Sequence, residues 1–165
     1  MLDRSGRVAS IMQKKFGVEK GDRVVIYMPM VIEAAFVILA CARLGAIHSV
    51  VFGGFAPKEL ASRIDDCFPK LIVTSSYGIE PGKHIAYPPI VEEALGFCKV
   101  EKAKEIPRLI KQRTGELDGK LVYKDLNEFY HDYDTLMDGE KTVAAAVAVP
   151  SNHPLYILYT SGTTG

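Results

Sequence analysis

Residues 23–27, with the sequence RVVIY, decide the fold class of this 165-residue chain. They include three consecutive β-branched residues and are closely followed by Pro29, a pattern that predicts a short buried strand. Helical patterns lie on both sides of this strand. Residues 8–16 carry apolar side chains at helical spacing, and residues 31–44 are almost entirely apolar, which predicts a helix buried on more than one side.

The same alternation continues along the chain. Two more apolar strands are predicted at residues 46–51 and 71–74, and a helix that begins near Pro57 separates them. Strands that alternate with helices through short loops are typical of parallel strands joined by crossover helices. Continuous apolar strands also indicate a sheet covered on both faces. The sequence therefore predicts the α/β class, with a largely parallel sheet and crossover helices.

The pattern is less regular after residue 74. Pro107 lacks a backbone N–H, so a strand in this region would have to lie at a sheet edge or start later. The secondary structure of residues 142–149 is ambiguous from sequence. The remaining expectations are a long loop at 75–89, a short helix at 90–97, a strand within 106–111, a helix at 121–133 and an apolar strand at 155–159.

Composition excludes several classes of protein. Twenty Lys and Arg balance twenty Asp and Glu, so no charge excess indicates binding to nucleic acid or to a membrane. The longest apolar run, residues 34–42, is far shorter than the ~20 residues of a membrane-spanning helix. Three widely spaced cysteines without a Cys-x-x-Cys pair indicate reduced thiols. We therefore expect an intracellular soluble protein, cytoplasmic or in the mitochondrial matrix, with no nucleic-acid or membrane partner and no metal held by its own side chains.

The last six residues follow an apolar segment and are rich in glycine and hydroxyl groups. Gly162 and Gly165 allow successive backbone N–H groups to turn inward and surround an anion, and Thr160 and Ser161 add hydroxyl donors. This composition suits a triphosphate, although a short match of this kind also fits a surface turn. The segment is not a Walker A loop, because no Gly-x-x-x-x-Gly-Lys-Ser/Thr occurs in the chain.

Residues 156–165, YILYTSGTTG, resemble the phosphate-binding signature of the adenylate-forming acyl-CoA synthetases. Three further segments resemble the short-chain branch, which contains the acetyl- and propionyl-CoA synthetases. Within that branch, residues 78–82 and 153–156 are more similar to the propionyl type. The three segments are GDRVVIYMPM at 21–30, ACARLGAIHSV at 40–50 and VFGGF at 51–55.

The resemblance implies an activity. These enzymes join a carboxylate, here propionate or acetate, to ATP, which gives an acyl adenylate and pyrophosphate. Coenzyme A then displaces AMP. ATP, Mg²⁺ and coenzyme A are the implied cofactors, and the implied substrates are small molecules. The implied ATP phosphate-binding residues are Thr160, Ser161, Gly162, Thr163, Thr164 and Gly165. The implied coenzyme A-binding residues are Phe52, Gly53, Gly54, Glu80, Pro81, Gly82 and Lys83.

Both implied coenzyme A segments have a simpler structural interpretation. The Phe52-Gly53-Gly54 segment could equally be a tight strand-to-helix turn with a core Phe, whose glycines the turn itself requires. The Glu80-Pro81-Gly82-Lys83 segment could be a surface turn with a solvated Lys. Glu80 stands where acetyl-CoA synthetases have a second basic residue, and a carboxylate would repel a phosphate.

The resemblance also implies that residues 1–165 are part of the large N-terminal domain of such an enzyme, truncated at the phosphate-binding loop. No catalytic residue is expected in this part, and we expect the chain alone to be inactive. The alternative is a truncated, non-catalytic α/β module that binds a nucleotide or a partner chain.

Overall fold

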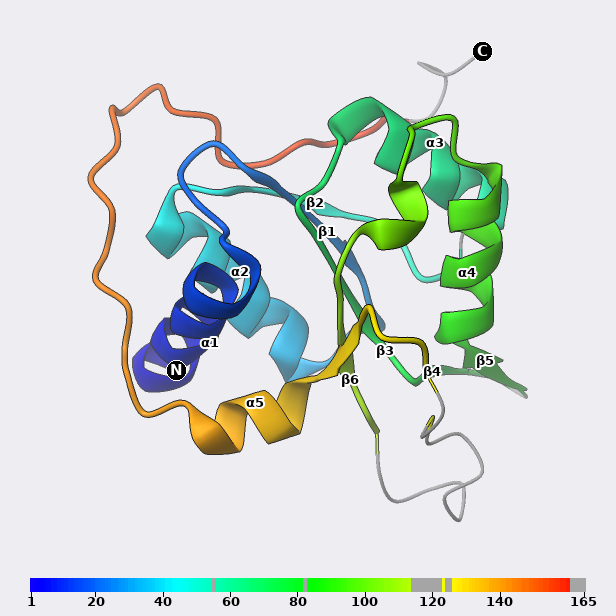
Figure 1. Ribbon diagram of the computed structural model, residues 1–165, viewed down its shortest axis with the longest axis horizontal. Helices are drawn as coiled ribbons and strands as arrows, with labels where there is room; N and C mark the ends of the chain where they lie inside the picture. The colour runs from blue at the N-terminus through cyan, green and yellow to red at the C-terminus, as the bar shows by residue number, and fades with distance from the viewer. Residues whose placement is uncertain (55, 82, 114–122, 124–125, 161–165) are drawn as a thin grey trace.

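A computed structural model of the chain describes residues 1–54, 56–81, 83–113, 123 and 126–160 (Figure 1). Its centre is a five-stranded sheet with the strand order β2-β1-β3-β6-β7. Every neighbouring pair in this sheet is parallel, so the predicted α/β class with a largely parallel sheet is confirmed. The strands are β1 (Arg23–Tyr27), β2 (Ile47–Val50), β3 (Leu71–Ser75), β6 (Arg108–Lys111) and β7 (Tyr130–Asp132).

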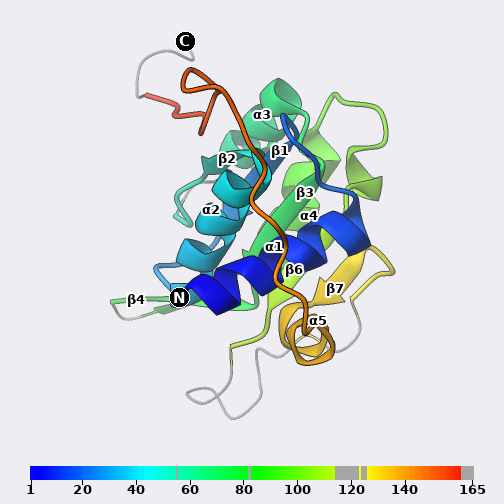
Figure 2. The same ribbon diagram turned by 90° about the vertical axis from the view of Figure 1, so that its left-hand side faces the viewer.

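Helices cover both faces of the sheet, as parallel strands require (Figure 1). In Figure 2 the helices α1 and α2 lie in front of the sheet, and α5 lies beside them. The opposite face is covered by α3 and α4, followed by a short 3₁₀ turn, η1. The helices are α1 (Leu2–Phe16), α2 (Ile32–Leu44), α3 (Pro57–Cys67), α4 (Tyr87–Phe97), η1 (Ala103–Glu105) and α5 (Tyr133–Gly139).

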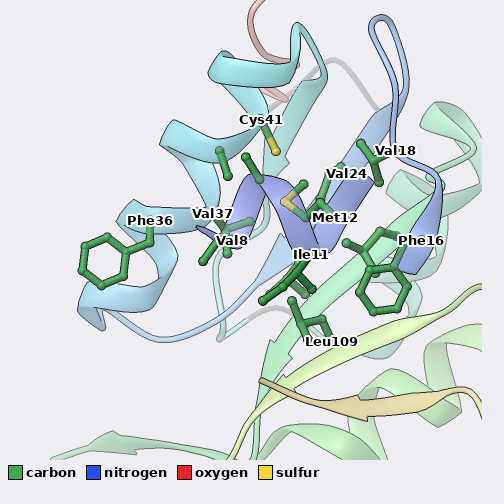
Figure 3. Close-up of a cluster of buried hydrophobic side chains, with 14 of the residues drawn as sticks. Val8, Ile11, Met12, Phe16, Val18, Val24, Phe36, Val37, Cys41 and Leu109 are labelled. Atoms are coloured by element: carbon green, nitrogen blue, oxygen red, sulfur yellow. The ribbon is translucent and has the colours of Figure 1, made fainter. Parts of the chain in front are cut away.

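Successive residues of β1 face opposite sides of the sheet and so belong to two different cores. Val24 and Ile26 join the cluster under α1, α2 and α5, which Figure 3 shows in close-up. Val25 and Tyr27 join the cluster under α3 and α4. All four side chains are fully buried. The continuous apolar pattern of the strand therefore reflects burial on both faces, as the sequence predicts.

The predicted loop at 75–89 is wrong. Ser75 ends β3, and an antiparallel hairpin of β4 (Tyr77–Glu80) and β5 (Lys83–Ala86) follows, with α4 beginning at Tyr87. The prolines that suggested a loop lie at the hairpin tip and in the first turn of α4. In that turn a missing N–H costs no hydrogen bond.

The predicted helix at 121–133 is also wrong within the described residues. Tyr130–Asp132 forms β7, and the helix begins only at Tyr133, where Asp132 Oδ1 accepts a hydrogen bond from Thr135 N at 2.7 Å. These residues pair with β6, and this pairing outweighs the helical spacing of the aromatic side chains on which the predicted helix was based. The later start of the strand after Pro107 is confirmed, because β6 begins at Arg108.

Residues 155–159 do not form the predicted regular strand. Tyr156 makes one parallel bridge with His48, in which Ile157 N donates to His48 O at 2.9 Å. Leu155 and Leu158 are half or more exposed, so little apolar burial stabilises an extended pairing.

Residues 142–149, which the sequence left open, form neither helix nor strand. Helix α2 is buried mainly on one side, because Ile32 and Leu39 on its other side are exposed.

The segment after α5 is tied to α1 by polar contacts. The Arg7 guanidinium donates to the backbone oxygens of Met137 and Glu140. The Glu140 carboxylate accepts from Thr142 N at 2.7 Å, from Ser10 Oγ at 3.0 Å and from Lys14 Nζ at 3.2 Å. The Thr142 N–H is the main cause that lowers the pKa of Glu140 from 4.5 to about 2, and Lys14 and Ser10 add to it.

We expect Glu140→Gln to lower the free energy of unfolding at pH 7 by about 1 kcal/mol, because the exposed Lys14 partner limits the electrostatic gain. A carboxyl whose pKa is depressed on folding stabilises the protein above its ordinary pKa and loses this effect as the pH falls. The difference from the unmutated chain should therefore shrink between pH 4.5 and about 2. Urea unfolding at several pH values measures it, with Glu93→Gln on α4 as the control. A difference that is absent at pH 7 contradicts the role of Glu140.

Candidate functional site

Two of the sequence-predicted segments meet at one end of the sheet. The 52–54 turn follows β2, and the β4–β5 hairpin follows β3 after a single residue. Figure 1 shows the hairpin beyond the end of the sheet at which β3 finishes. Tyr27, the last residue of β1, donates its hydroxyl hydrogen to Gly53 O at 3.2 Å. The carboxyl ends of parallel strands form the usual ligand-binding edge of α/β folds, and both candidate segments lie there.

Phe52 is an exposed aromatic residue in this turn. Its side chain is 67% exposed, so the alternative that it is a core residue is wrong. The ring lies against the backbone of the turn, because a Cβ placed on Gly54 would be only 2.6 Å from Phe52 Cε1. An exposed ring beside bare backbone offers a flat apolar surface to a heterocycle.

The hairpin tip carries a local ion pair. Glu80 and Lys83 are cross-strand partners, and Lys83 Nζ lies 3.5 Å from Glu80 Oε2. The Lys83 side chain is 65% exposed, and the neighbouring Pro81 is also exposed. Gly82 lies outside the described residues. The ammonium group of Lys83 is thus accessible, with a carboxylate beside it that offsets part of its charge.

A second cation lies at the base of the hairpin. The Arg113 guanidinium is 4.9 Å from the centre of the Tyr77 ring and donates to Tyr77 O at 3.3 Å. Its backbone N–H donates to Ser76 Oγ at 2.9 Å. Sequence reasoning missed Arg113, although its position just after the carboxyl end of β6 was a usable signal.

Two buried tyrosines lie beneath the turn and the hairpin. The rings of Tyr27 and Tyr87 are 5.0 Å apart between centroids, and both side chains are almost completely buried. Burial raises the pKa of both phenols, and the nearby Glu80 carboxylate raises them further. Both therefore remain neutral at physiological pH. The sequence did not single out Tyr87, because its contacts with Gly53 and Tyr27 are made between parts of the chain that are far apart in sequence.

The candidate phosphate-binding residues lie mostly outside the described part of the chain. Thr160 is described and exposed, whereas Ser161, Gly162, Thr163, Thr164 and Gly165 are not described. The preceding Tyr159 donates its hydroxyl hydrogen to Asp66 Oδ2 at 2.6 Å, in the last turn of α3. That turn lies at the amino end of the sheet, because Arg23 at the start of β1 donates to Cys67 O at 2.6 Å. The residue that precedes the candidate phosphate-binding residues therefore lies against α3.

Metal ligands and thiol nucleophiles are the other groups of the described residues that could carry chemistry. The described residues include no group of three His, Cys, Asp or Glu side chains that could hold a metal ion. The same part of the chain has no helix long and apolar enough to cross a membrane. The three cysteines are free, and burial is the main cause that raises the pKa of the Cys41 and Cys67 thiols to about 12. These two thiols are therefore poor nucleophiles.

Comparison with known proteins gives matches over the whole chain. The family model described as "AMP-binding enzyme" matches residues 1–165. Acyl-CoA synthetase short-chain family member 3, mitochondrial, of Homo sapiens is 49% identical over 166 residues, which cover 100% of this chain. Acetyl-coenzyme A synthetase of Methylobacterium radiotolerans is 42% identical over 159 residues, which cover 96% of this chain.

The chain spans 23% of the length of each of these two relatives. Acetyl-coenzyme A synthetase of Leptospira biflexa, at 46% identity over 153 residues, covers 92% of the chain and is likewise matched over 23% of its own length. The similarity to the family model and to the human relative thus extends over the turn, the hairpin and residues 160–165 together. The chain belongs to the AMP-binding enzyme family.

Proposed function

We propose that residues 1–165 are part of the large N-terminal domain of an ATP-dependent short-chain carboxylate–CoA ligase. The relatives are named as acyl-CoA and acetyl-coenzyme A synthetases, which supports this class of reaction. The observation that carries the proposal is the meeting of the 52–54 turn and the β4–β5 hairpin at the carboxyl end of the sheet. Propionate is the proposed carboxylate, on the resemblance of residues 78–82 and 153–156 to the propionyl type.

The proposed reaction has two steps. The carboxylate attacks the α-phosphate of ATP, which forms an acyl adenylate and releases pyrophosphate. The thiol of coenzyme A then attacks the acyl carbon and releases AMP. In the first step, the backbone N–H and hydroxyl groups of residues 160–165 would stabilise the charge on the leaving pyrophosphate. Mg²⁺ would neutralise part of the phosphate charge, and we assign it no side chain of the described residues.

In the second step, this chain would bind and orient coenzyme A. The exposed Phe52 ring would support the heterocycle, and the exposed Lys83 ammonium would bind a phosphate of the same ligand. Gly53 and Gly54 would shape the turn, because Tyr87 and Phe52 occupy the space that their side chains would take, and Gly82 would allow the ligand to approach the hairpin tip closely. Glu80 and Pro81 would shape the hairpin tip, with Glu80 weakening the phosphate contact.

The relatives extend well beyond the matched segment. The carboxylate pocket, the adenine pocket and the lid with its catalytic Lys would therefore come from parts of the enzyme outside this chain.

The name of the human relative includes the word mitochondrial, which supports the mitochondrial matrix as one of the two proposed compartments. The cytoplasm is the other.

Two substitutions at the Glu80–Lys83 ion pair should change the KM for coenzyme A in opposite directions. The test protein is a chimera in which residues 1–165 replace the matching segment of the human relative. Lys83→Ala should raise the KM for coenzyme A about tenfold, because a phosphate loses a charge-assisted partner. Glu80→Gln should lower this KM about twofold, because the carboxylate no longer competes for the ammonium group. Steady-state AMP release at varied coenzyme A concentration measures both values.

A matched ion pair elsewhere in the chain provides the control. Lys102 and Glu105 are also separated by three positions, with Nζ and Oε2 3.8 Å apart and both side chains exposed. Lys102→Ala and Glu105→Gln should leave the KM for coenzyme A unchanged, and none of the four variants should alter pyrophosphate exchange. If Lys83→Ala leaves the KM for coenzyme A unchanged, the hairpin is not part of the coenzyme A site.

A further inference from the structure

The hydroxyl group of Tyr87 lies against both the 52–54 turn and strand β4 of the hairpin that carries Glu80 and Lys83. A Cβ placed on Gly53 would overlap the Tyr87 hydroxyl oxygen. A Cβ placed on Gly78, in β4, would lie 2.6 Å from the same oxygen and 3.0 Å from Tyr87 Cζ. Real Cβ atoms essentially never come closer than 3.0 Å to such a neighbour. One phenol thus fills the space between the 52–54 turn and the β4–β5 hairpin.

The surrounding structure holds this phenol firmly. Tyr87 is the first residue of α4 and is only 3% exposed. Its backbone N–H donates to Ser76 O at 3.2 Å, and its ring packs on Tyr27 at 5.0 Å. Tyr27 in turn donates to Gly53 O, so the pair contacts the turn at two points. A displacement of Tyr87 would therefore move the turn and the hairpin relative to each other.

We propose that Tyr87 is a positioning residue of the coenzyme A site, which sets the separation between the 52–54 turn and the β4–β5 hairpin. This inference rests on the proposed function. One coenzyme A molecule must reach the Phe52 ring on the turn and the Lys83 ammonium at the hairpin tip together. The spacing of the two segments decides whether both contacts form. Glycine is required at positions 53 and 78 because the phenol occupies the space of a side chain.

The test combines Gly78→Ala and Tyr87→Phe in the chimera. Gly78→Ala should raise the half-saturating coenzyme A concentration about tenfold, since a shift of about 1 Å at a binding site is costly. Tyr87→Phe alone should raise it about twofold. In the double variant the nearest atom to the new Cβ is Cζ at 3.0 Å, which small movements accommodate. The double variant should therefore recover most of the affinity that Gly78→Ala loses, giving a strong coupling between the sites.

Pyrophosphate exchange separates positioning from a general structural role. All three variants should exchange pyrophosphate within about twofold of the unmutated chimera, because this half-reaction does not use coenzyme A. Gly96→Ala on α4 is the matched control, since a Cβ there meets no atom within 4 Å. Additive effects of Gly78→Ala and Tyr87→Phe would overturn the inference, as would a parallel loss of pyrophosphate exchange. Lys83→Ala in the same chimera distinguishes the two proposals. If the Tyr87 test fails while Lys83→Ala still raises the KM for coenzyme A, only the positioning role of Tyr87 is contradicted and the proposed function stands.

Discussion

Gly162→Val in the chimera should reduce adenylate formation at least about 100-fold, because removal of one preorganised donor from such a site already costs this much. The proposed loop needs backbone N–H groups turned toward the phosphates, and a β-branched residue does not easily adopt the positive φ that such a loop requires. The Val side chain would also occupy space next to the phosphate. Exchange of labelled pyrophosphate into ATP, in the presence of propionate, measures this half-reaction directly.

A second glycine provides the control for this substitution. Gly96 lies in α4, and a Cβ there meets no atom within 4 Å, so Gly96→Val should leave pyrophosphate exchange close to that of the unmutated chimera. Both variants should unfold at a similar temperature. If Gly162→Val exchanges pyrophosphate normally, residues 160–165 do not surround the phosphates and the assignment of this loop fails.

A strand is predicted well from sequence where its own apolar residues show that it is buried. Residues 24–27 are apolar and fully buried on both faces of the sheet, so a local pattern is sufficient to locate β1. The helices α1 and α2 end at Gly17 and Gly45, which adopt the left-handed conformation that glycine favours. In these segments, local propensity and tertiary packing lead to the same structure.

The elements that sequence predicts poorly depend on distant partners. β7 forms because β6, about twenty residues earlier, offers an edge for pairing, and the short Tyr130–Asp132 segment has no strong pattern of its own. The β4–β5 hairpin contains Gly78 and Pro81, which alone indicate a loop. A sequence pattern that reflects only burial does not reveal its cross-strand pairing, which joins Tyr77 to Ala86 and Glu80 to Lys83.

The candidate site shows the same division. Phe52, Glu80 and Lys83 were found because they belong to short motifs in sequence. Tyr87 and Arg113 were missed because their relevance comes from contacts with residues far along the chain, such as Gly53 for Tyr87 and Tyr77 for Arg113. Sequence motifs identify candidate ligand-binding residues, whereas the buried side chains that hold those motifs in place are identified only from the packing.

Residues 1–165 alone should not release AMP from propionate, ATP, Mg²⁺ and coenzyme A. The chain matches only 23% of the human relative, and in our proposal the carboxylate and adenine pockets and the catalytic Lys come from other parts of the enzyme. Catalysis needs ATP and the carboxylate held in near-attack geometry, and misplacement by about 1 Å can cost ~100-fold. The chimera restores these parts, so it should release AMP and form the acyl-CoA.

The most direct test is to follow AMP release by the chimera and by residues 1–165 side by side, with coenzyme A present or omitted. The relative's remaining segment, without this chain, is the control. We expect sustained AMP release only from the chimera and only when coenzyme A is present. A folded chimera that releases no AMP, although the unmodified relative does, would contradict the claim that this chain is a functional part of a carboxylate–CoA ligase. So would AMP release by residues 1–165 alone.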